Sequence, residues 1–395
     1  MAGSNTDRIV VVEGARTPIG RFGGAFKDLA AHDLGAAAIR AALTRAELSA
    51  DDVDEVVMGQ VGQVGKDAFN ARRAALAAGI PQSRPAYNVN RLCGSGLQAI
   101  WAAAMQLRWG GVDVVVAGGN ESMTNMPFYD YTTRFGRRMG DVTLVDGLLV
   151  MLSDPWGDHH MGITAENVAA KYRVSRREQD EFALESQRRA ATDAARAAFA
   201  EEIAPVETGG SKPLTVTEDE HPRPDTTLET LRSLAPAFDT NGTVTAGNSS
   251  GINDGGAALV LMRESDAAER GLTPLAALEA VTRAAMDPSL MGYTPVFALQ
   301  QLFAETGIKP ADLDIAEINE AFAAQAYAVI RDAGLDFEKT NPYGGAIALG
   351  HPVGATGANL SLRVVKDLVR RDGELGVVSM CIGGGQALAA LYRRV

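Results

Sequence analysis

One arrangement of strands, helices and turns occurs twice in this chain of 395 residues, and it limits the fold more than any other feature. In each copy an acidic and apolar segment begins a strand, a glycine-rich turn leads into a helix, and an apolar strand follows. The matching pairs are 52–57 with 312–317, the turn at Cys93 with the turn 344–351, and 112–117 with 376–381. The repeat predicts two copies of one α/β unit. The ends of equivalent strands are then expected to lie close together.

Strands and helices alternate along both copies. The β-branched run at 8–12, the run at 54–59 and the nearly continuous apolar runs at 111–119 and 257–262 predict buried strands. Apolar residues at helical spacing predict helices over 32–46, 70–78 and from the Cys93 turn to about Trp109. This alternation predicts an α/β fold, with helices covering the sheet faces.

The composition changes between the two copies. The segment carries Pro213, Pro222, Pro224 and Pro236 and a helix rich in arginine and acidic residues over 173–189. We expect most of these arginines to lie on a solvated, ion-paired face and a minority to be available for a phosphate. The predicted organisation is a first half over 1–124 and 246–276, an inserted loop domain over 125–245 and a second half over 277–395.

The net charge and the cysteine content restrict the class of protein. A net charge of -12 opposes binding to nucleic acid, which is held by clustered Lys and Arg. The sequence contains no run of about 18 apolar residues, so no membrane partner is expected. The start of the chain, 1–8, is polar, and the two cysteines do not form a disulfide framework. We therefore expect a cytoplasmic protein.

A glycine-rich segment over 59–67 resembles a phosphate-binding loop only superficially. Its glycine spacing is wrong, and Asp67 stands where a Ser or Thr would bind magnesium. The segment is predicted to be a turn.

Cys93 lies in a Gly-Ser-Gly turn before a helix. A lone cysteine is either a small buried apolar residue or a nucleophile, and its position leaves both possibilities open. A helix N-terminus favours the thiolate, so we expect a lowered pKa for Cys93. Gly94 and Gly96 are expected to let a substrate approach the sulfur, as in the strained turns that present catalytic serines.

Three further residues are candidates for catalysis. His351, one of five histidines, lies in a glycine-rich turn before Pro352 and would accept a proton from a nearby thiol, or else simply bond to backbone. Cys381 ends an apolar strand and is either a proton shuttle or inert, and the amide of Gly383 beside it would serve an oxyanion hole. Asn319 follows a strand and is either a polar site residue or a helix cap.

Six ordered blocks together resemble the thiolase family, close to the bacterial acetyl-CoA acetyltransferases and 3-ketoacyl-CoA thiolases, over almost the full length. They are 12–20, 90–96, Asp239 with 242–248, 319–322, 344–357 and 381–385. The resemblance implies a duplicated, layered α-β-α-β-α fold with an inserted loop domain. It also implies an acyltransferase that uses coenzyme A thioesters, without a metal or a cofactor beyond coenzyme A as substrate and product.

The resemblance assigns a role to each catalytic candidate. Cys93 is the acylated nucleophile and His351 the base that activates it. Cys381 is the acid and base at the acetyl carbon, and Asn319 holds a water in an oxyanion hole shared with His351. The amides of Cys93 and Gly383 form a second hole.

The inserted domain resembles the part of thiolases that binds coenzyme A. Ser250 and Leu148 resemble residues at the pantetheine arm, and Arg223 resembles a residue at the nucleotide end. Phe322 belongs to the 319–322 block and is also expected to contact substrate. A further pair, His160 and Met161, resembles a loop of tetrameric short-chain thiolases in which the Met narrows the acyl pocket of a neighbouring active site. The same loop at 158–160 is not expected to bind a metal, since further ligands of suitable spacing are lacking.

Departures from the family pattern affect substrate choice. Tyr343 replaces an asparagine beside the catalytic turn, Arg91 stands where Gln or Lys is frequent, and the loop 151–158 differs. The predicted reaction is the reversible joining of two acetyl-CoA into acetoacetyl-CoA, in a homo-oligomer, a dimer or tetramer. The alternatives are a 3-ketoacyl-CoA thiolase for longer or branched chains, in β-oxidation or aromatic degradation, and a silent acyl-CoA-binding or lipid-binding relative.

Overall fold

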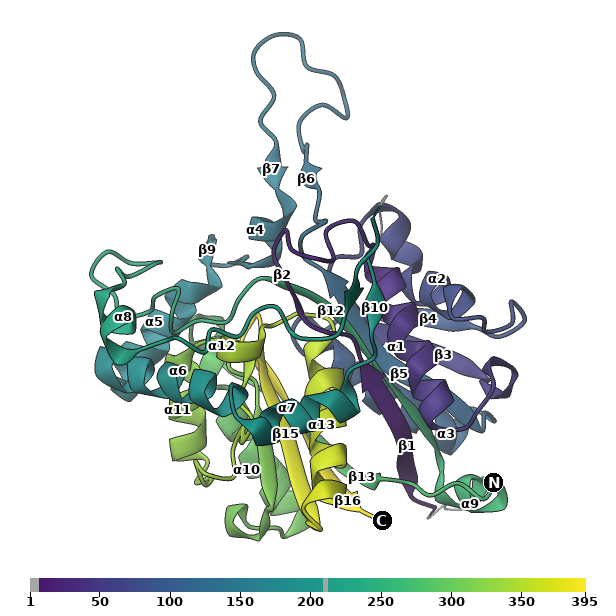
Figure 1. The fold of residues 1–395 in the computed structure, drawn as a ribbon. Helices are drawn as coiled ribbons and strands as arrows, with labels where there is room; N and C mark the ends of the chain where they lie inside the picture. Colours follow the sequence, from purple (N-terminus) through teal and green to yellow (C-terminus); the bar gives the residue numbers. More distant parts are fainter. Residues whose placement is uncertain (1–6, 209–211) are drawn as a thin grey trace.

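The structure is a computed structural model, and it describes residues 7–208 and 212–395, so most of the polar start of the chain lies outside the described residues. Two half-sheets form its framework (Figure 1). The first half-sheet has the order β4 (Ala86–Val89), β3 (Glu55–Gly59), β5 (Val114–Ser122), β12 (Asn253–Arg263) and β1 (Ile9–Arg16), with β2 (Gly20–Arg21) on β12. The second has the order β13 (Ala276–Ala285), β16 (Gln386–Arg394), β15 (Leu375–Ile382) and β14 (Ile315–Ile318).

The duplication predicted from the sequence is confirmed by the strand directions. The predicted alignment of one strand pair is wrong by three residues, because the strand register matches 376–381 with 115–120 and not with 112–117. In the first half β3 runs parallel to β4 and β5, whereas β12 is antiparallel to β5 and β1. The second half repeats this pattern, because β14 runs parallel to β15 while β16 is antiparallel to β15 and β13. A parallel bridge from β14 to Thr340 takes the place of β4. The two halves meet where β1 pairs with β13.

Equivalent hydrogen bonds strengthen the correspondence. Asp54, just before β3, accepts hydrogen bonds from the N–H groups of Asp113 and Val114 at 2.8 and 3.1 Å. Asp314, just before β14, accepts bonds from the N–H groups of Glu374 and Leu375 at 2.6 and 3.0 Å. A carboxylate therefore fixes the same strand junction in both halves.

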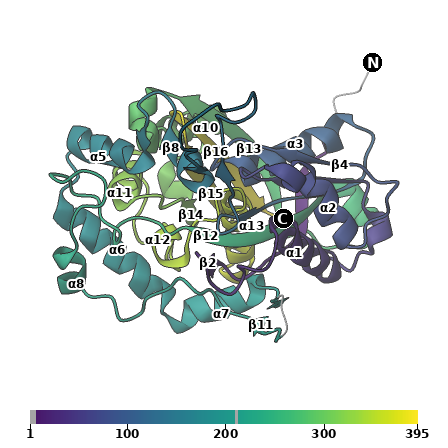
Figure 2. The ribbon, with the colours of Figure 1, turned by 90° about the horizontal axis from the view of Figure 1, so that it is seen from above.

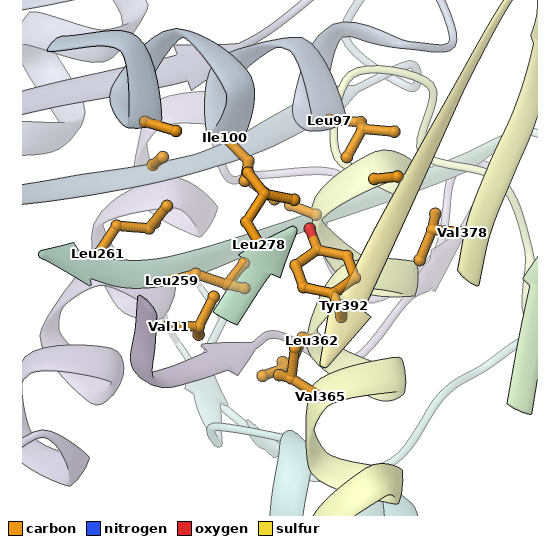
Figure 3. Close-up of a cluster of buried hydrophobic side chains, with 14 of the residues drawn as sticks. Val11, Leu97, Ile100, Leu259, Leu261, Leu278, Leu362, Val365, Val378 and Tyr392 are labelled. Carbon is orange, nitrogen blue, oxygen red and sulfur yellow. The ribbon is translucent and has the colours of Figure 1, made fainter. Parts of the chain in front are cut away.

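Helices cover both faces of each half-sheet and give the predicted five layers. The outer layers are α1 (Ala31–Arg45) and α2 (Asn70–Ala77) on the first half, and α10 (Pro295–Thr306) and α11 (Ala323–Asp332) on the second. The central layer contains α3 (Ser95–Trp109) and α13 (Thr356–Arg370). Figure 3 shows the core that these two helices share with strands of both halves, including Leu97, Leu259, Leu362 and Tyr392. The continuous strand runs are apolar because both faces of each strand are buried.

The two central helices approach each other closely at their first turns. A Cβ on Gly96 would lie 2.7 Å from the backbone N of Ala358, and one on Gly357 would lie 2.3 Å from the backbone N of Leu97. Only glycine fits at such distances, since real Cβ atoms do not approach backbone this closely. The N-terminal ends of α3 and α13 are thereby held side by side.

The chain between β5 and β12 forms the inserted domain. Its helices are α4 (Gly147–Met151), α5 (Met161–Tyr172), α6 (Arg176–Ala190), α7 (Asp193–Glu202) and α8 (Leu228–Ser233). Its short strands are β6 (Phe128–Tyr129), β7 (Val145–Asp146), β8 (Ser153–Asp154), β9 (His159–His160), β10 (Val206–Glu207) and β11 (Thr215–Val216). The β6–β7 hairpin projects away from the rest of the molecule (Figure 1). From above, α5, α6 and α8 lie beside the second half (Figure 2).

Most predicted elements occur within a few residues of their expected bounds. The remaining helices are α9 (Glu264–Glu269) and α12 (Ala346–Leu349). The arginine-rich helix is α6, where Arg176, Arg177 and Arg189 pair with acidic residues one turn away, as expected. Within 7–208 and 212–395, every helix is too short or too polar to cross a membrane. The exact domain boundaries stay predictions.

Candidate active site

A cavity of about 860 Å³ lies between the inserted domain and the ends of the two half-sheets. Cys93, His351 and Gly383 line it together, although they are far apart in the sequence. Asn319 and Cys381 are fully buried close behind this wall. Asn319 is next to the His351 ring, and Cys381 is close enough to Cys93 for the two thiols to interact electrostatically. The structure thus brings together all five catalytic candidates.

The turn that carries Cys93 is strained and firmly held. It connects β4 to α3, and Leu92 has a φ of 47°, which is costly for a residue with a side chain. Ser95 stabilises this shape, because its hydroxyl accepts from the N–H of Arg91 at 2.8 Å and donates to the carbonyl of Leu92 at 2.7 Å. Cys93 is therefore presented at a rigid strand-to-helix turn, as predicted.

The glycines beside Cys93 have a different role from the one expected. A Cβ on Gly94 would lie 2.4 Å from Cδ1 of Ile382, at the end of β15, and Gly96 faces the first turn of α13. Both glycines face protein rather than substrate. They allow the first-half turn to pack against the second half, so the expectation that they admit substrate is wrong.

The expected lowering of the Cys93 pKa is also wrong. Burial raises the pKa of the Cys93 thiol to about 11, although the backbone N–H groups of Gly383 and Cys93 itself hydrogen-bond to the sulfur and favour the thiolate. Desolvation of a charge outweighs these two dipoles. Cys93 is consequently a neutral thiol at rest, with two N–H donors directed at the reacting atom.

His351 is held by two hydrogen bonds, one at its backbone and one at its ring. Its backbone N–H donates to Oδ1 of Asn253 at 2.9 Å, and its Nδ1 lies 2.6 Å from the hydroxyl of Thr356. The same hydroxyl donates to the carbonyl of Pro352 at 3.0 Å. Because a carbonyl only accepts, the ring Nδ1 must donate to Thr356, and Nε2 is left unprotonated. Burial lowers the pKa of His351 to about 4, so the ring is a neutral base at physiological pH.

Cys381 and Asn319 complete the group. Burial and the neighbouring Cys93 raise the pKa of Cys381, which is therefore a protonated thiol and a potential proton donor. The Nδ2 of Asn319 lies 3.5 Å from Nε2 of His351, and its Oδ1 accepts no hydrogen bond from the part of the chain that the structure describes. Asn319 lies at the end of β14 and is not the cap of α11, which begins at Ala323.

The cavity is lined by five of the six predicted substrate-binding residues, which are Ser250, Met161, His160, Arg223 and Phe322. Leu148 is the exception. It packs against Met123 and Val353 behind the wall, and Leu152 lines the cavity in its place. Leu148 lies in the first turn of α4 and faces inward, whereas Leu152 is the residue at which α4 ends.

Two expectations about substrate choice need correction. Met161 was expected to reach a neighbouring active site, but it lines the cavity of its own chain, and a Cβ on Gly383 would lie 3.3 Å from its Cε. Tyr343 does not line the cavity. It packs in a separate core with Phe199, and its hydroxyl donates to Asp367 at 2.6 Å. Tyr343 is therefore remote from any bound acyl chain.

Two residues that position His351 were missed in the sequence. Thr356 belongs to the same glycine-rich block, and its spacing of five residues from His351 was an available signal. Asn253 begins β12 in the other half, and its Nδ2 also donates to the carbonyl of Gly20 at 3.0 Å. Its contact with His351 depends on the packing of the halves, so no local pattern indicates it.

This fold and site define a class of enzyme. A neutral thiol beside a neutral imidazole, two N–H donors at the sulfur and a second thiol behind it form a cysteine-dependent acyl-transfer site.

The comparisons with known proteins specify the family. Residues 9–265 match the family description "Thiolase, N-terminal domain", and residues 272–394 match "Thiolase, C-terminal domain". The beta-ketothiolase BktB of Cupriavidus necator is 49% identical and is aligned over 99% of this chain and 100% of its own. An acetyl-CoA acetyltransferase of Thiocystis violacea is 45% identical, with the same coverage of both chains.

Solved structures agree with these relatives. The acetyl-CoA acetyltransferase of Bacillus anthracis has a TM-score of 0.96 at 41% identity, covering 98% of this chain and 99% of that one. The human mitochondrial 3-ketoacyl-CoA thiolase has a TM-score of 0.95 at 42% identity, with the same coverage. The chain belongs to the thiolase family.

The Thr356 hydroxyl holds the His351 ring in a single tautomer. Thr356→Val keeps the shape but removes the acceptor that fixes Nδ1–H, so the ring loses its single tautomer and kcat/KM is expected to fall about 10- to 100-fold. Thr356→Ser restores the hydroxyl and is the matched control, with activity close to wild type. Iodoacetamide labelling of Cys93 at neutral pH measures base assistance directly. Equal labelling and turnover in the Val and Ser variants would contradict the tautomer argument.

Proposed function

We propose that the protein is a thiolase that joins two acetyl-CoA molecules into acetoacetyl-CoA and free coenzyme A, and that also runs the reverse cleavage. The observation that carries the proposal is the convergence of Cys93, His351 and Gly383 on one cavity, with Cys381 and Asn319 behind it. The names of the relatives support this reaction, since they include acetyl-CoA acetyltransferases and a beta-ketothiolase. The proposed reaction is an acyl transfer.

The first step forms an acyl-enzyme. Nε2 of His351 takes the Cys93 proton as the sulfur attacks the thioester carbonyl of acetyl-CoA. The N–H groups of Cys93 and Gly383 bind the oxyanion, because they already point at the sulfur. The intermediate collapses, the C–S bond to coenzyme A breaks, and the departing thiolate takes the proton of Cys381. Cys381 is then a thiolate, and His351 keeps the proton that it took from Cys93.

The second step forms the carbon–carbon bond. The Cys381 thiolate takes a proton from the α-carbon of a second acetyl-CoA, and the carbanion attacks the acyl carbon on Cys93. The C–S bond to Cys93 breaks, and the Cys93 thiolate takes its proton back from His351. The enolate oxygen lies between Asn319 and His351. In cleavage the order reverses, and the protonated Cys381 donates to the leaving acetyl carbon. Its raised pKa suits a donor to carbon.

The proposal also covers the ligand, the residues that contact it and the location of the protein. Coenzyme A is a substrate and product, and the chain itself supplies the nucleophile, base, acid and oxyanion donors, so we propose no bound cofactor or metal. Ser250 and Phe322 would contact the pantetheine arm and acyl end, and Arg223 the nucleotide. The cytoplasmic location is proposed from the two free cysteines.

Replacing the two cysteines separates the steps. Cys93→Ser is expected to lower thiolysis by roughly three or more orders of magnitude, because the nucleophile acts as part of a unit. Cys381→Ser should still accept an acetyl group on Cys93 while carbon–carbon chemistry slows. Mass spectrometry after incubation with labelled acetyl-CoA measures the acylation. Near-normal turnover in the first variant, or an unlabelled Cys93 in the second, would overturn the assigned roles.

Acyl-chain length distinguishes the proposed reaction from its alternative, a 3-ketoacyl-CoA thiolase for longer chains. Thiolysis of 3-ketoacyl-CoA should fall about ten-fold or more beyond four carbons, because Met161 and Phe322 line the cavity where they pack in one cluster with Cys381. Met161→Ala should raise activity on the six-carbon substrate relative to the four-carbon one. Tyr343→Phe, outside the cavity, is the matched control and should leave the ratio unchanged. Flat activity in the wild-type enzyme would favour the alternative.

We also propose a homo-oligomer in which the β6–β7 hairpin contacts a second copy of the chain. Phe135 and Met139 on this hairpin are 98% and 90% exposed. Strand β4 is a sheet edge, and Trp109 at the end of α3 is 90% exposed nearby in the same half. Large exposed apolar side chains and open strand edges are typical of protein interfaces.

Light scattering after size exclusion tests the assembly. The wild-type protein is expected at the mass of two or four chains. Replacing both Phe135 and Met139 with Ser should reduce the assembled fraction, because burying each large apolar side chain contributes about 1.5–3 kcal/mol. Thr132→Ser on the same hairpin is the control. A monomeric wild-type protein would contradict the proposal.

A further inference from the structure

Glu121 is a buried carboxylate for which the reaction above has no role. It lies near the end of β5 and is completely inaccessible to solvent. Burial raises its pKa to about 7, even though hydrogen bonds favour the ionised form. Burying a carboxylate costs free energy unless hydrogen bonds or an opposite charge compensate it. The hydrogen-bond partners of Glu121 therefore indicate its function.

The carboxylate accepts three hydrogen bonds, all from backbone N–H groups on two separate loops. Val61 donates to Oε2 at 2.9 Å and Gly62 donates to Oε1 at 3.0 Å. Gly354 donates to Oε2 at 2.9 Å. The first loop follows β3 and is the glycine-rich turn whose sequence resembles a phosphate loop. Its free N–H groups bind a carboxylate of the chain itself.

Both anchored loops form the wall of the cavity. Val61 and Val353, next to the anchored amides, line it together with Cys93. Gly354 also lies three residues after His351, so its anchor fixes the turn that carries the catalytic base. The turn also lies close against the carboxylate, since a Cβ on Gly354 would lie only 2.7 Å from Oε2 of Glu121, and glycine is therefore required at this position.

The duplicated fold places a related contact on the other side. Counting from the paired strands, Glu121 on β5 corresponds to Ile382 on β15. Ile382 packs on Gly94, in the Cys93 turn of the opposite half. Each strand end thus holds the catalytic turn of the other half, Ile382 through an apolar contact and Glu121 through hydrogen bonds.

We propose that Glu121 is a positioning residue that sets the placement of the His351 turn relative to Cys93, and thereby the rate at which Cys93 is acylated. This inference rests on the proposed function and extends it. The residue does not touch substrate. Its effect is therefore on the chemical step rather than on the affinity for coenzyme A thioesters.

Glu121→Gln tests the proposal with little change in shape. An amide has one acceptor oxygen, so at least one of the three N–H groups loses its partner. We expect kcat and the single-turnover acylation rate to fall at least ten-fold, with KM for acetyl-CoA within two-fold of wild type. Glu121→Asp, which keeps the charge but shortens the reach, should show the same split and replaces the Gln variant if that does not fold.

Asp54→Asn is the matched control. Asp54 also accepts bonds from backbone N–H groups, at the opposite end of β5 and away from the cavity. It should lower the unfolding temperature with kcat unchanged. The inference fails if the wild-type enzyme is active and the folded Glu121 variants keep kcat within two-fold of wild type. It also fails if their KM for acetyl-CoA rises as much as their kcat falls. If the wild-type enzyme has no thiolase activity, the proposed function itself fails.

Discussion

The close packing of α3 against α13 is the contact on which the site depends. Both helices begin at the catalytic turns, and Gly96 and Gly357 let their first turns approach to backbone distance. Any larger residue at these two positions would separate the helix ends. Cys93 and His351 come from different halves of the chain, so their proximity is a direct consequence of this interface. The duplicated fold is thus what assembles the catalytic group.

Desolvation sets the protonation state of that group. Burial raises the pKa of Cys93 to about 11 and lowers the pKa of His351 to about 4, so both are neutral over the physiological range. A preformed thiolate–imidazolium pair is therefore not the resting state. In the proposed mechanism, proton transfer therefore accompanies attack on the thioester, when the N–H groups of Cys93 and Gly383 would compensate the new negative charge on oxygen.

The sequence was sufficient for the features that have local signals. Strand runs, helix periods and the repeat predicted the layers. The glycine-rich turns together with the family resemblance pointed to Cys93, Asn319, His351, Cys381 and Gly383, which the structure brings together. Features that depend on tertiary packing were not accessible. The pKa of Cys93 is governed by burial, which a turn motif does not report. Leu148 and Leu152 are one helical turn apart, and only the end of α4 decides which of them faces the cavity.

Tyr343 illustrates the same limit. It precedes His351 by only eight residues, yet α12 intervenes and directs its ring toward Phe199 on α7. Proximity in sequence to a catalytic residue therefore gave a false indication of proximity in space. Asn253 shows the converse, since it is almost a hundred residues from His351 and holds its backbone at 2.9 Å.

The two halves have kept one architecture while their equivalent positions have acquired different tasks. By strand register, Cys381 corresponds to Asn120, which is fully buried and exchanges side-chain hydrogen bonds with Asn70 at 2.7 and 2.9 Å. One position thus carries the proposed proton shuttle in the second half and a structural amide pair in the first. Ser95 and Thr356, at the starts of α3 and α13, both bond back to the preceding turn, but only Thr356 also contacts a catalytic ring. A symmetric scaffold therefore supports an asymmetric reaction, because nucleophile and base must differ while the frame that aligns them need not.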